Sequence, residues 1–244
     1  MNPIIKNKRL NHAALALAVI GCAGALLWPR LVPAAAESEA VDIPAAEQPI
    51  ATAPTGMQAA VLAGGCFWGV EAVFEHVEGV TDVVSGYAGG DADTASYRAT
   101  NSGRTGHAEA VRIEYDPSVV GYTDLLQIYF SVAHDPTQVG GQGPDRGSQY
   151  RSAVFALDDD QSRAARDYIA QLDGAEVYDA PIATEVTPIA ADGFYPAEDY
   201  HQDFATRNPN HPYIRYWDAP KVSALQARFE DRYRARPALP LASR

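Results

Sequence analysis

The run GGCFWG at residues 64–69 contains the side chain most suited to chemistry, the thiol of Cys66. The apolar stretch 59–63 before it is typical of a buried strand, and apolar residues recur after it at helical spacing. Cys66 therefore falls in the first turn of a predicted helix, where free backbone N–H groups and the helix dipole favour an anion. We expect a lowered thiol pKa and a nucleophilic thiolate, with the apolar rings of Phe67 and Trp68 beside it.

The same residues permit a purely structural interpretation. A single cysteine often serves as a small buried hydrophobic residue, and two glycines before a helix can be ordinary turn chemistry. The run by itself leaves both interpretations open.

A second candidate, Glu109, lies on a strand predicted over 107–115. In the alternating pattern of that strand it shares a face with the large apolar residues Val111, Ile113 and Tyr115. A carboxyl group on a buried face resists ionisation, so its pKa rises and it can donate a proton near neutral pH. The other interpretation is a glutamate at a strand end that points into solvent.

The surrounding elements alternate irregularly between strands and helices. Further strands are predicted at 80–86, 152–157 and 182–190. Helices are predicted around 123–132, after the acidic run 158–160, and at 196–204, whereas 209–244 is expected to wrap the surface. This order predicts an α+β fold, a two-layer domain with helices packed on a mixed β-sheet.

The composition excludes several classes of protein. Nineteen Lys and Arg against 31 Asp and Glu give a formal net charge of −12 without a basic stripe, which disfavours a nucleic-acid partner. The glycine-rich loop 134–149 has no phosphate-binding lysine and follows no strand, so we reject a nucleotide site. Of the two cysteines, Cys22 lies in the N-terminal apolar segment. Cys66 alone forms neither an internal disulfide nor a cysteine-based zinc site, and we expect no metal.

The N-terminus is typical of an export signal. Three basic residues precede the apolar stretch 13–28, and the three alanines at 34–36 offer a cleavage site. Lipidation at Cys22 and an uncleaved membrane anchor are the alternatives. All three place the folded part outside the cytoplasmic membrane, in the periplasm if the host is Gram-negative.

These signals divide the chain into four parts. Residues 1–36 are expected to be the signal peptide or membrane anchor, and any membrane contact is confined to them. Residues 37–56, rich in Ala, Pro and Glu, predict a disordered linker. A catalytic domain at 57–222 and a C-terminal tail at 223–244 follow.

Several runs together resemble the peptide methionine sulfoxide reductase A family. They are GCFWG at 65–69, GHAEAV at 106–111, HDPTQ at 134–138 and QYRS at 149–152. AEDYHQ at 197–202 and the pair Asn208-Pro209 are similar to its C-terminal signature. The resemblance extends in the same order from about Val61 to about Lys221. It implies a ferredoxin-like two-layer domain and reduction of the S epimer of methionine sulfoxide.

The resemblance also implies catalytic roles. Cys66 matches the nucleophile that attacks the sulfoxide sulfur and becomes a sulfenic acid. Glu109 matches the acid that protonates the sulfoxide oxygen, and Tyr97 and Tyr150 match hydrogen-bond donors to that oxygen. Asp145 matches a further acid that supports the site.

Substrate and partners follow from the same resemblance. Phe67 and Trp68 match the apolar walls that hold the methyl group of the substrate. The substrates would be free methionine sulfoxide and oxidised proteins, and the enzyme would repair oxidative damage as a monomer. Reversal of methionine oxidation needs a thiol that takes the oxygen, and no bound cofactor is implied.

The recycling step is expected to differ from that of many relatives. They carry resolving cysteines in the C-terminal tail, and 223–244 contains none. An external thiol, such as thioredoxin, glutaredoxin or glutathione, would therefore reduce the sulfenic acid directly. Val139-Gly140-Gly141 also stands where many relatives have an Asn-Arg pair, which loosens the loop or changes peptide preference.

The sequence allows three rival interpretations. A papain-like hydrolase or acyltransferase would pair Cys66 with one of four histidines, His107, His134, His201 or His211. A non-catalytic exported binding domain would not need the thiol at all. A B-type reductase is the weakest rival, because its paired zinc-binding cysteines are absent from the sequence.

Overall fold

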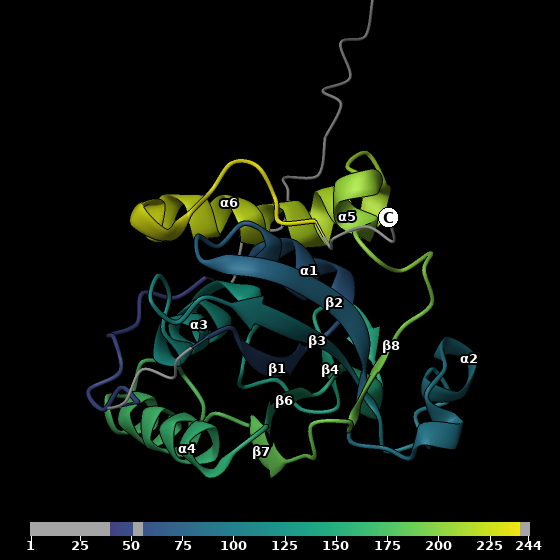
Figure 1. Ribbon diagram of the computed structural model, residues 1–244, viewed down its shortest axis with the longest axis horizontal. Helices are drawn as coiled ribbons and strands as arrows, with labels where there is room; N and C mark the ends of the chain where they lie inside the picture. Colours follow the sequence, from purple (N-terminus) through teal and green to yellow (C-terminus); the bar gives the residue numbers. More distant parts are fainter. Residues whose placement is uncertain (1–39, 51–55, 240–244) are drawn as a thin grey trace, which may run out of the picture. The chain divides into compact units, whose positions relative to one another are not determined.

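A six-stranded sheet organises the part of the chain that the computed structural model describes, residues 40–50 and 56–239 (Figure 1). The strand order is β7-β6-β1-β3-β2-β8, and every neighbouring pair is antiparallel except β6 with β7. The strands are β1 (Gln58–Gly64), β2 (Val80–Ala88), β3 (Ala108–Tyr115), β6 (Ser152–Ala156), β7 (Glu185–Pro188) and β8 (Phe194–Pro196). The predicted mixed sheet is confirmed.

Helices and short irregular elements complete the described residues. The α-helices are α1 (Phe67–Glu75), α2 (Tyr97–Thr100), α3 (Tyr122–Ile128), α4 (Asp159–Gly174), α5 (Phe204–Arg207) and α6 (Ala219–Arg228). π-Helices cover Tyr129–Ala133 and Ile214–Asp218, and 3-10 helices cover Ala92–Thr94, Ser148–Tyr150 and Glu230–Arg232. A small hairpin joins β4 (Gly141–Gln142) to β5 (Asp145–Arg146).

The connections give the predicted ferredoxin-like topology. The run β1-α1-β2-β3-α3-β6 places its four strands side by side in the order β6-β1-β3-β2, which is the split βαβ arrangement. From β6 the chain crosses through α4 to the parallel edge strand β7, because two parallel strands need a long crossover. The start of α4 follows from its sequence, since the Asp158 carboxylate accepts the Gln161 N–H at 2.7 Å.

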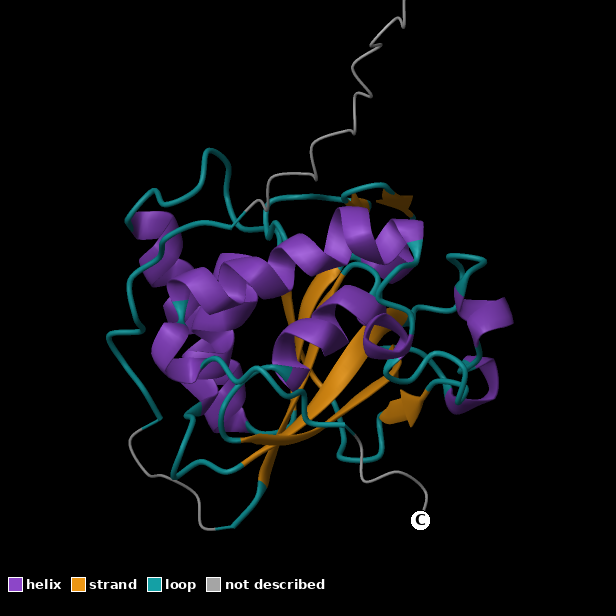
Figure 2. Ribbon diagram, turned by 90° about the horizontal axis from the view of Figure 1, so that it is seen from above, coloured by secondary structure: helices purple, strands orange, loops and turns teal. Residues whose placement is uncertain are grey.

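Alternating side chains on β1 separate two cores. Ala60 and Leu62 face the main core, to which α1, α3, α4 and α6 contribute apolar residues. Val61 and Ala63 face the opposite side of the sheet, where Phe155 fills a smaller cluster. Figure 2 shows the helices gathered alongside the sheet. α1 therefore begins at the edge of the main core with its first turn next to the end of β1.

The C-terminal third differs from the prediction. The helix predicted at 196–204 is absent from the described residues, which form turns there before α5. The described part of the predicted surface wrap, residues 209–239, also contributes to the core, because α6 buries Leu225 completely there. A domain boundary at residue 222 is accordingly wrong, since it would cut through α6. Pro220 argued against predicting a helix here, although proline is well tolerated in the first turn of a helix.

Residues 40–50 form an ordered segment without regular structure, which we call the strap. Its backbone is hydrogen-bonded to side chains of α3, α4 and α6 and to the first π-helix. These bonds join Val41 to Ser131, Ile43 to Gln127, Pro44 to Tyr168, Ala45 to Gln171, and Ala40 to Arg228. The disorder predicted for 37–56 is therefore wrong for the strap, because this part of the chain satisfies its carbonyl groups on the domain.

The predicted signal peptide at 1–36 lies outside the described residues. Within the residues that the structure describes, none of the helices has the length and apolar character needed to span a membrane.

Candidate active site

Cys66 lies in the turn between β1 and α1, as the sequence predicts, and its side chain is partly exposed. It is the N-cap residue of α1. Gly65 has φ +92°, and a Cβ atom at this position would lie 2.6 Å from Cγ of Gln142. Only glycine fits this turn, because its backbone is left-handed and the β4 side chain packs directly on it.

The thiol of Cys66 does not have the lowered pKa that its position at a helix N-terminus predicts. Burial raises the pKa of the thiol well above its ordinary value of 9.0, and the nearby carboxyl groups of Glu109, Asp218 and Asp145 raise it further. The Trp68 N–H acts in the opposite direction. Desolvation and three acidic neighbours therefore outweigh the helix terminus, and in the free enzyme the thiol keeps its proton at neutral pH.

Glu109 lies at the start of β3 and is 4% exposed. Its Oε2 accepts the Phe67 N–H at 3.1 Å, so the carboxyl group caps the helix that begins next to Cys66. Burial raises the pKa of Glu109 to about 8, although the Phe67 N–H opposes the shift. At neutral pH the group is mostly protonated. This agrees with the raised pKa that we expect because the alternating pattern of the strand places Glu109 on a buried face.

The structure brings both predicted tyrosines to this site. Tyr97 is the first residue of α2, and its N–H donates to Oε1 of Glu198 at 3.1 Å. Tyr150 ends a 3-10 helix that follows β5. Burial raises the pKa of each phenol, and both Glu109 and Cys66 raise it further. The two hydroxyl groups therefore remain protonated and available as hydrogen-bond donors around the thiol and the acid.

The two aromatic residues after Cys66 occupy different environments. Trp68 is half-buried and stacks on Phe204 with ring centroids 3.8 Å apart, and its Nε1–H donates to Nδ1 of His201 at 3.3 Å. Phe67 is 1% exposed and packs between Tyr87 and His201. Trp68 thus presents apolar surface next to the thiol. Phe67 is buried and packs on His201, which in turn contacts Trp68.

Two residues of the site, Tyr213 and Asp218, were not predicted from the sequence, and a third, His201, was named only as a possible partner of Cys66 in a rival hydrolase. The Tyr213 hydroxyl donates to Oδ2 of Asp145 at 2.5 Å and lies close enough to Cys66 for the thiol to raise its pKa. His201, in the run predicted as a signature, contacts both aromatic rings that follow Cys66. Asp218 is 1% exposed and approaches the first turn of α1. For Tyr213 and Asp218 the sequence carries no local signal, because both lie in a segment predicted as a surface wrap.

The position of Asp218 explains why residue 69, the last of the GGCFWG run, is glycine. A Cβ atom on Gly69 would lie 2.2 Å from Oδ1 of Asp218, so no larger residue fits at this point of α1. Burial raises the pKa of Asp218 to about 6, and Lys221, with Nζ 3.7 Å from Oδ1, opposes this shift. The carboxylate is ionised at neutral pH and contributes to keeping the thiol of Cys66 protonated.

Together these groups form a cysteine-dependent redox or transfer site. A thiol, a buried carboxylic acid and two phenols converge, and both the acid and the phenols carry protons at neutral pH. Such an arrangement can stabilise negative charge on a substrate oxygen and protonate it while sulfur attacks.

Comparison with known proteins identifies the family. The family model for peptide methionine sulfoxide reductase matches residues 58–233. Peptide methionine sulfoxide reductase MsrA 2 of Mesorhizobium japonicum is 55% identical over 191 residues, which cover 78% of this chain and 97% of that protein. MsrA 2 of Synechocystis is 52% identical over 187 residues, covering 77% and 86%.

Solved structures agree with the fold. Mxr1 from Saccharomyces cerevisiae in its reduced form has a TM-score of 0.56 and 32% identity, covering 65% of this chain and 89% of that one. Methionine sulfoxide reductase A of Corynebacterium diphtheriae has a TM-score of 0.55 and 33% identity, covering 75% and 93%.

The chain therefore belongs to the peptide methionine sulfoxide reductase family. Its curated relatives at 48–55% identity are reductases of the A type. The protein is accordingly a peptide-methionine (S)-S-oxide reductase.

The raised thiol pKa leads to a direct prediction. Iodoacetamide should alkylate Cys66 slowly at pH 7 and progressively faster above pH 9.0, because only the thiolate reacts. Asp218→Asn should move this profile to lower pH, since it removes one negative neighbour. Asp160→Asn, on an exposed position of α4, is the matched control and should leave the profile unchanged. A profile centred below that of a free cysteine would contradict the assignment.

Proposed function

We propose that this enzyme repairs oxidised proteins through a sulfenic acid on Cys66, with Glu109 as the proton donor. The observation that carries the proposal is the protonated, buried carboxyl group of Glu109 next to the turn that holds the thiol. A sulfoxide oxygen is a poor leaving group unless it is protonated, and a neutral carboxylic acid with two phenols can supply that proton and hydrogen bonds.

The proton balance of the first step suits this pair of groups. Glu109 gives its proton to the sulfoxide oxygen as Sγ of Cys66 attacks the sulfoxide sulfur, and the thiol proton passes to the Glu109 carboxylate. The oxygen is transferred to Sγ as a hydroxyl group, and the substrate leaves as a thioether. The substrate sulfur gains two electrons and Cys66 loses two, so no metal or external electron is needed in this step.

Recycling requires thiols from outside the enzyme. Cys66 is the cysteine of the described residues, and it is free. One external thiol condenses with the sulfenic acid and releases water, which leaves a mixed disulfide on Cys66. A second thiol then attacks that disulfide and regenerates Cys66. We assign the thiol to a small or protein reductant such as glutathione, glutaredoxin or thioredoxin.

Mass spectrometry of the full chain tests this cycle. After one equivalent of methionine-S-sulfoxide, we expect Cys66 to gain one oxygen atom, and after addition of glutathione we expect one glutathione adduct in its place. Cys22→Ser should behave in the same way, because the cycle uses no second cysteine. A disulfide between Cys22 and Cys66 that forms during turnover and is required for it would contradict the proposal.

We further propose that the enzyme is exported and acts on proteins outside the cytoplasmic membrane. The support is the basic and apolar N-terminal sequence followed by small residues at 34–36. The N-terminal mass of the protein recovered from its native host distinguishes cleavage near Ala36, lipidation at Cys22 and retention of the whole segment. An unprocessed chain recovered from the cytoplasm would contradict export.

A further inference from the structure

We propose that Glu71, Glu75 and Asp203 bind one divalent metal ion, with Ca²⁺ as the favoured ion, on the side of α1 that faces α5. This site is separate from the catalytic groups, and the inference does not depend on the proposed reaction mechanism. It also departs from the expectation, drawn from the sequence, that the protein has no metal.

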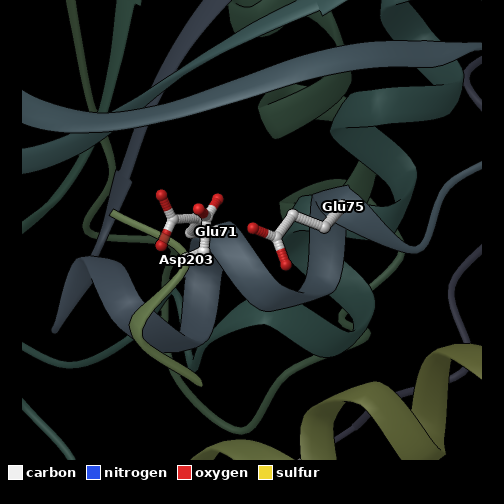
Figure 3. A group of neighbouring side chains, drawn as sticks. All are labelled: Glu71, Glu75 and Asp203. Atoms are coloured by element: carbon white, nitrogen blue, oxygen red, sulfur yellow. The ribbon is translucent and has the colours of Figure 1, made fainter. Parts of the chain in front are cut away.

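The three acidic residues form a buried cluster between two elements. Glu71 and Glu75 lie one turn apart on α1, and Asp203 precedes α5 (Figure 3). Each is at most 4% exposed, and one oxygen from each lies within 4.8 Å of the others. Two oxygens on opposite sides of a Ca²⁺ ion are about 4.6–5.2 Å apart, because Ca²⁺–O distances are about 2.3–2.6 Å. The spacing therefore fits oxygen ligands that share one ion.

Each acid uses at most one oxygen for bonds to the protein. Thr206 donates to Oε2 of Glu75 at 2.8 Å, and Arg207 pairs with Oδ2 of Asp203 at 2.7 Å. Oε1 of Glu75, Oδ1 of Asp203 and both carboxyl oxygens of Glu71 have no hydrogen-bond partner among the described residues. Buried oxygens without partners are rare and costly, so these four atoms are available to bind a ligand.

Ser85 provides a second observation that points to a ligand. This residue lies on β2, is completely buried, and its hydroxyl group also lacks a hydrogen-bond partner in the part of the chain that the structure describes. Ser85 shares its face of β2 with Val83 and Tyr87, which pack in the main core beside α1, so its hydroxyl group points toward the helix that carries Glu71. A hydroxyl group from a different element thus completes an all-oxygen environment, which is the donor set that Ca²⁺ prefers.

The charges in this region also favour a divalent ion. In the ionised form that would bind a metal ion, the three carboxylates and the Arg207 guanidinium carry a net charge of −2, which one divalent cation neutralises. Arg234 and Asp82 are the other charged groups that influence the cluster, and they have opposite signs.

An ion here would connect the helix that carries the nucleophile to the wall of the catalytic site. α1 begins directly after Cys66, and Asp203 is followed by Phe204, the residue that stacks on Trp68. β2, which carries Ser85, pairs with the strand that holds Glu109. Binding would therefore stabilise the folded enzyme and fix the positions of α1, α5 and β2 relative to one another.

The experiment is a calorimetric titration of the full chain, after treatment with a chelator, with Ca²⁺ and separately with Mg²⁺ and Mn²⁺. We expect one Ca²⁺ per chain and an unfolding temperature that rises with Ca²⁺ concentration. Glu71→Gln should weaken binding at least about tenfold, because it removes a charged ligand but keeps the size of the side chain. The double variant Asp159→Asn, Asp160→Asn, in the exposed acidic turn of α4, should bind Ca²⁺ like the original protein.

Two results would overturn the proposal. One is the absence of saturable binding by the original protein with all three ions at millimolar concentration, in which case protons alone occupy the cluster. The other is binding that Glu71→Gln leaves unchanged. Should Glu71→Gln fail to fold, Ser85→Ala replaces it, because this change removes a single uncharged ligand. Ser85→Ala should weaken Ca²⁺ binding several-fold, and unchanged affinity would again contradict the site.

Discussion

Cys66→Ser is expected to lower the turnover of a methyl aryl sulfoxide by at least about 10⁴-fold, since a hydroxyl group cannot replace the thiol that takes the oxygen. The change keeps the shape of the side chain, and it removes a thiol whose pKa the surroundings already raise. The fold and its unfolding temperature should therefore be little affected. The measurement is the rate of thiol-dependent loss of sulfoxide under excess substrate.

Cys22→Ser is the matched control for this experiment. It removes the other cysteine of the chain, which lies outside the described residues, and should retain full activity. Activity that survives Cys66→Ser, or that disappears in Cys22→Ser, would remove Cys66 as the nucleophile.

Glu109→Gln is expected to slow sulfoxide reduction by about 10²–10⁴-fold with a small effect on substrate affinity, because the amide cannot deliver a proton to the oxygen. It can still accept the Phe67 N–H, so the start of α1 should be preserved. Single-turnover kinetics separate the reductive step from recycling by the external thiol. Glu114→Gln, on the same strand in a half-exposed pair with Arg112, is the control and should leave the rate unchanged.

The pH dependence of the reductive step gives the same residue a second test. Burial raises the pKa of Glu109 to about 8, so the donor carries its proton below this pH and loses it above. The rate should therefore fall as the pH increases through about 8, and this decline should be absent from Glu109→Gln. An increase in rate across that range would show that ionisation of Cys66, rather than the proton on Glu109, limits the step.

The sequence predicted the elements whose signals are local. The strand, the glycine turn and the helix around Cys66 are found where the apolar spacing placed them, and the alternation of β3 correctly buried Glu109. The same reasoning gave the wrong pKa shift for Cys66. Position at a helix N-terminus is visible in a sequence, whereas the carboxyl groups around the thiol come from three other segments and meet it only after folding.

Residues that join the site over long separations were missed for a related reason. Tyr213 reaches Asp145 across 68 positions of sequence, and no spacing rule connects the two. Helix α6 was not predicted because it has few large apolar residues and carries Pro220 in its first turn, yet Leu225 is fully buried. Family resemblance supplied the roles of Tyr97 and Tyr150, which their surroundings in the sequence would not have singled out among 13 tyrosines.

The strap has a practical consequence for anyone who prepares this enzyme. The span matched by the family model begins at residue 58, so a shortened protein starting at Met57 looks complete. In such a protein, the side chains of Gln127, Tyr168 and Gln171 would lose the strap carbonyl groups to which they donate, and these donors would face water. Recombinant versions should retain residue 40 onward. Truncation at the family boundary would remove the hydrogen bonds that the strap makes to three helices, and the resulting loss of stability could be misread as a property of the full enzyme.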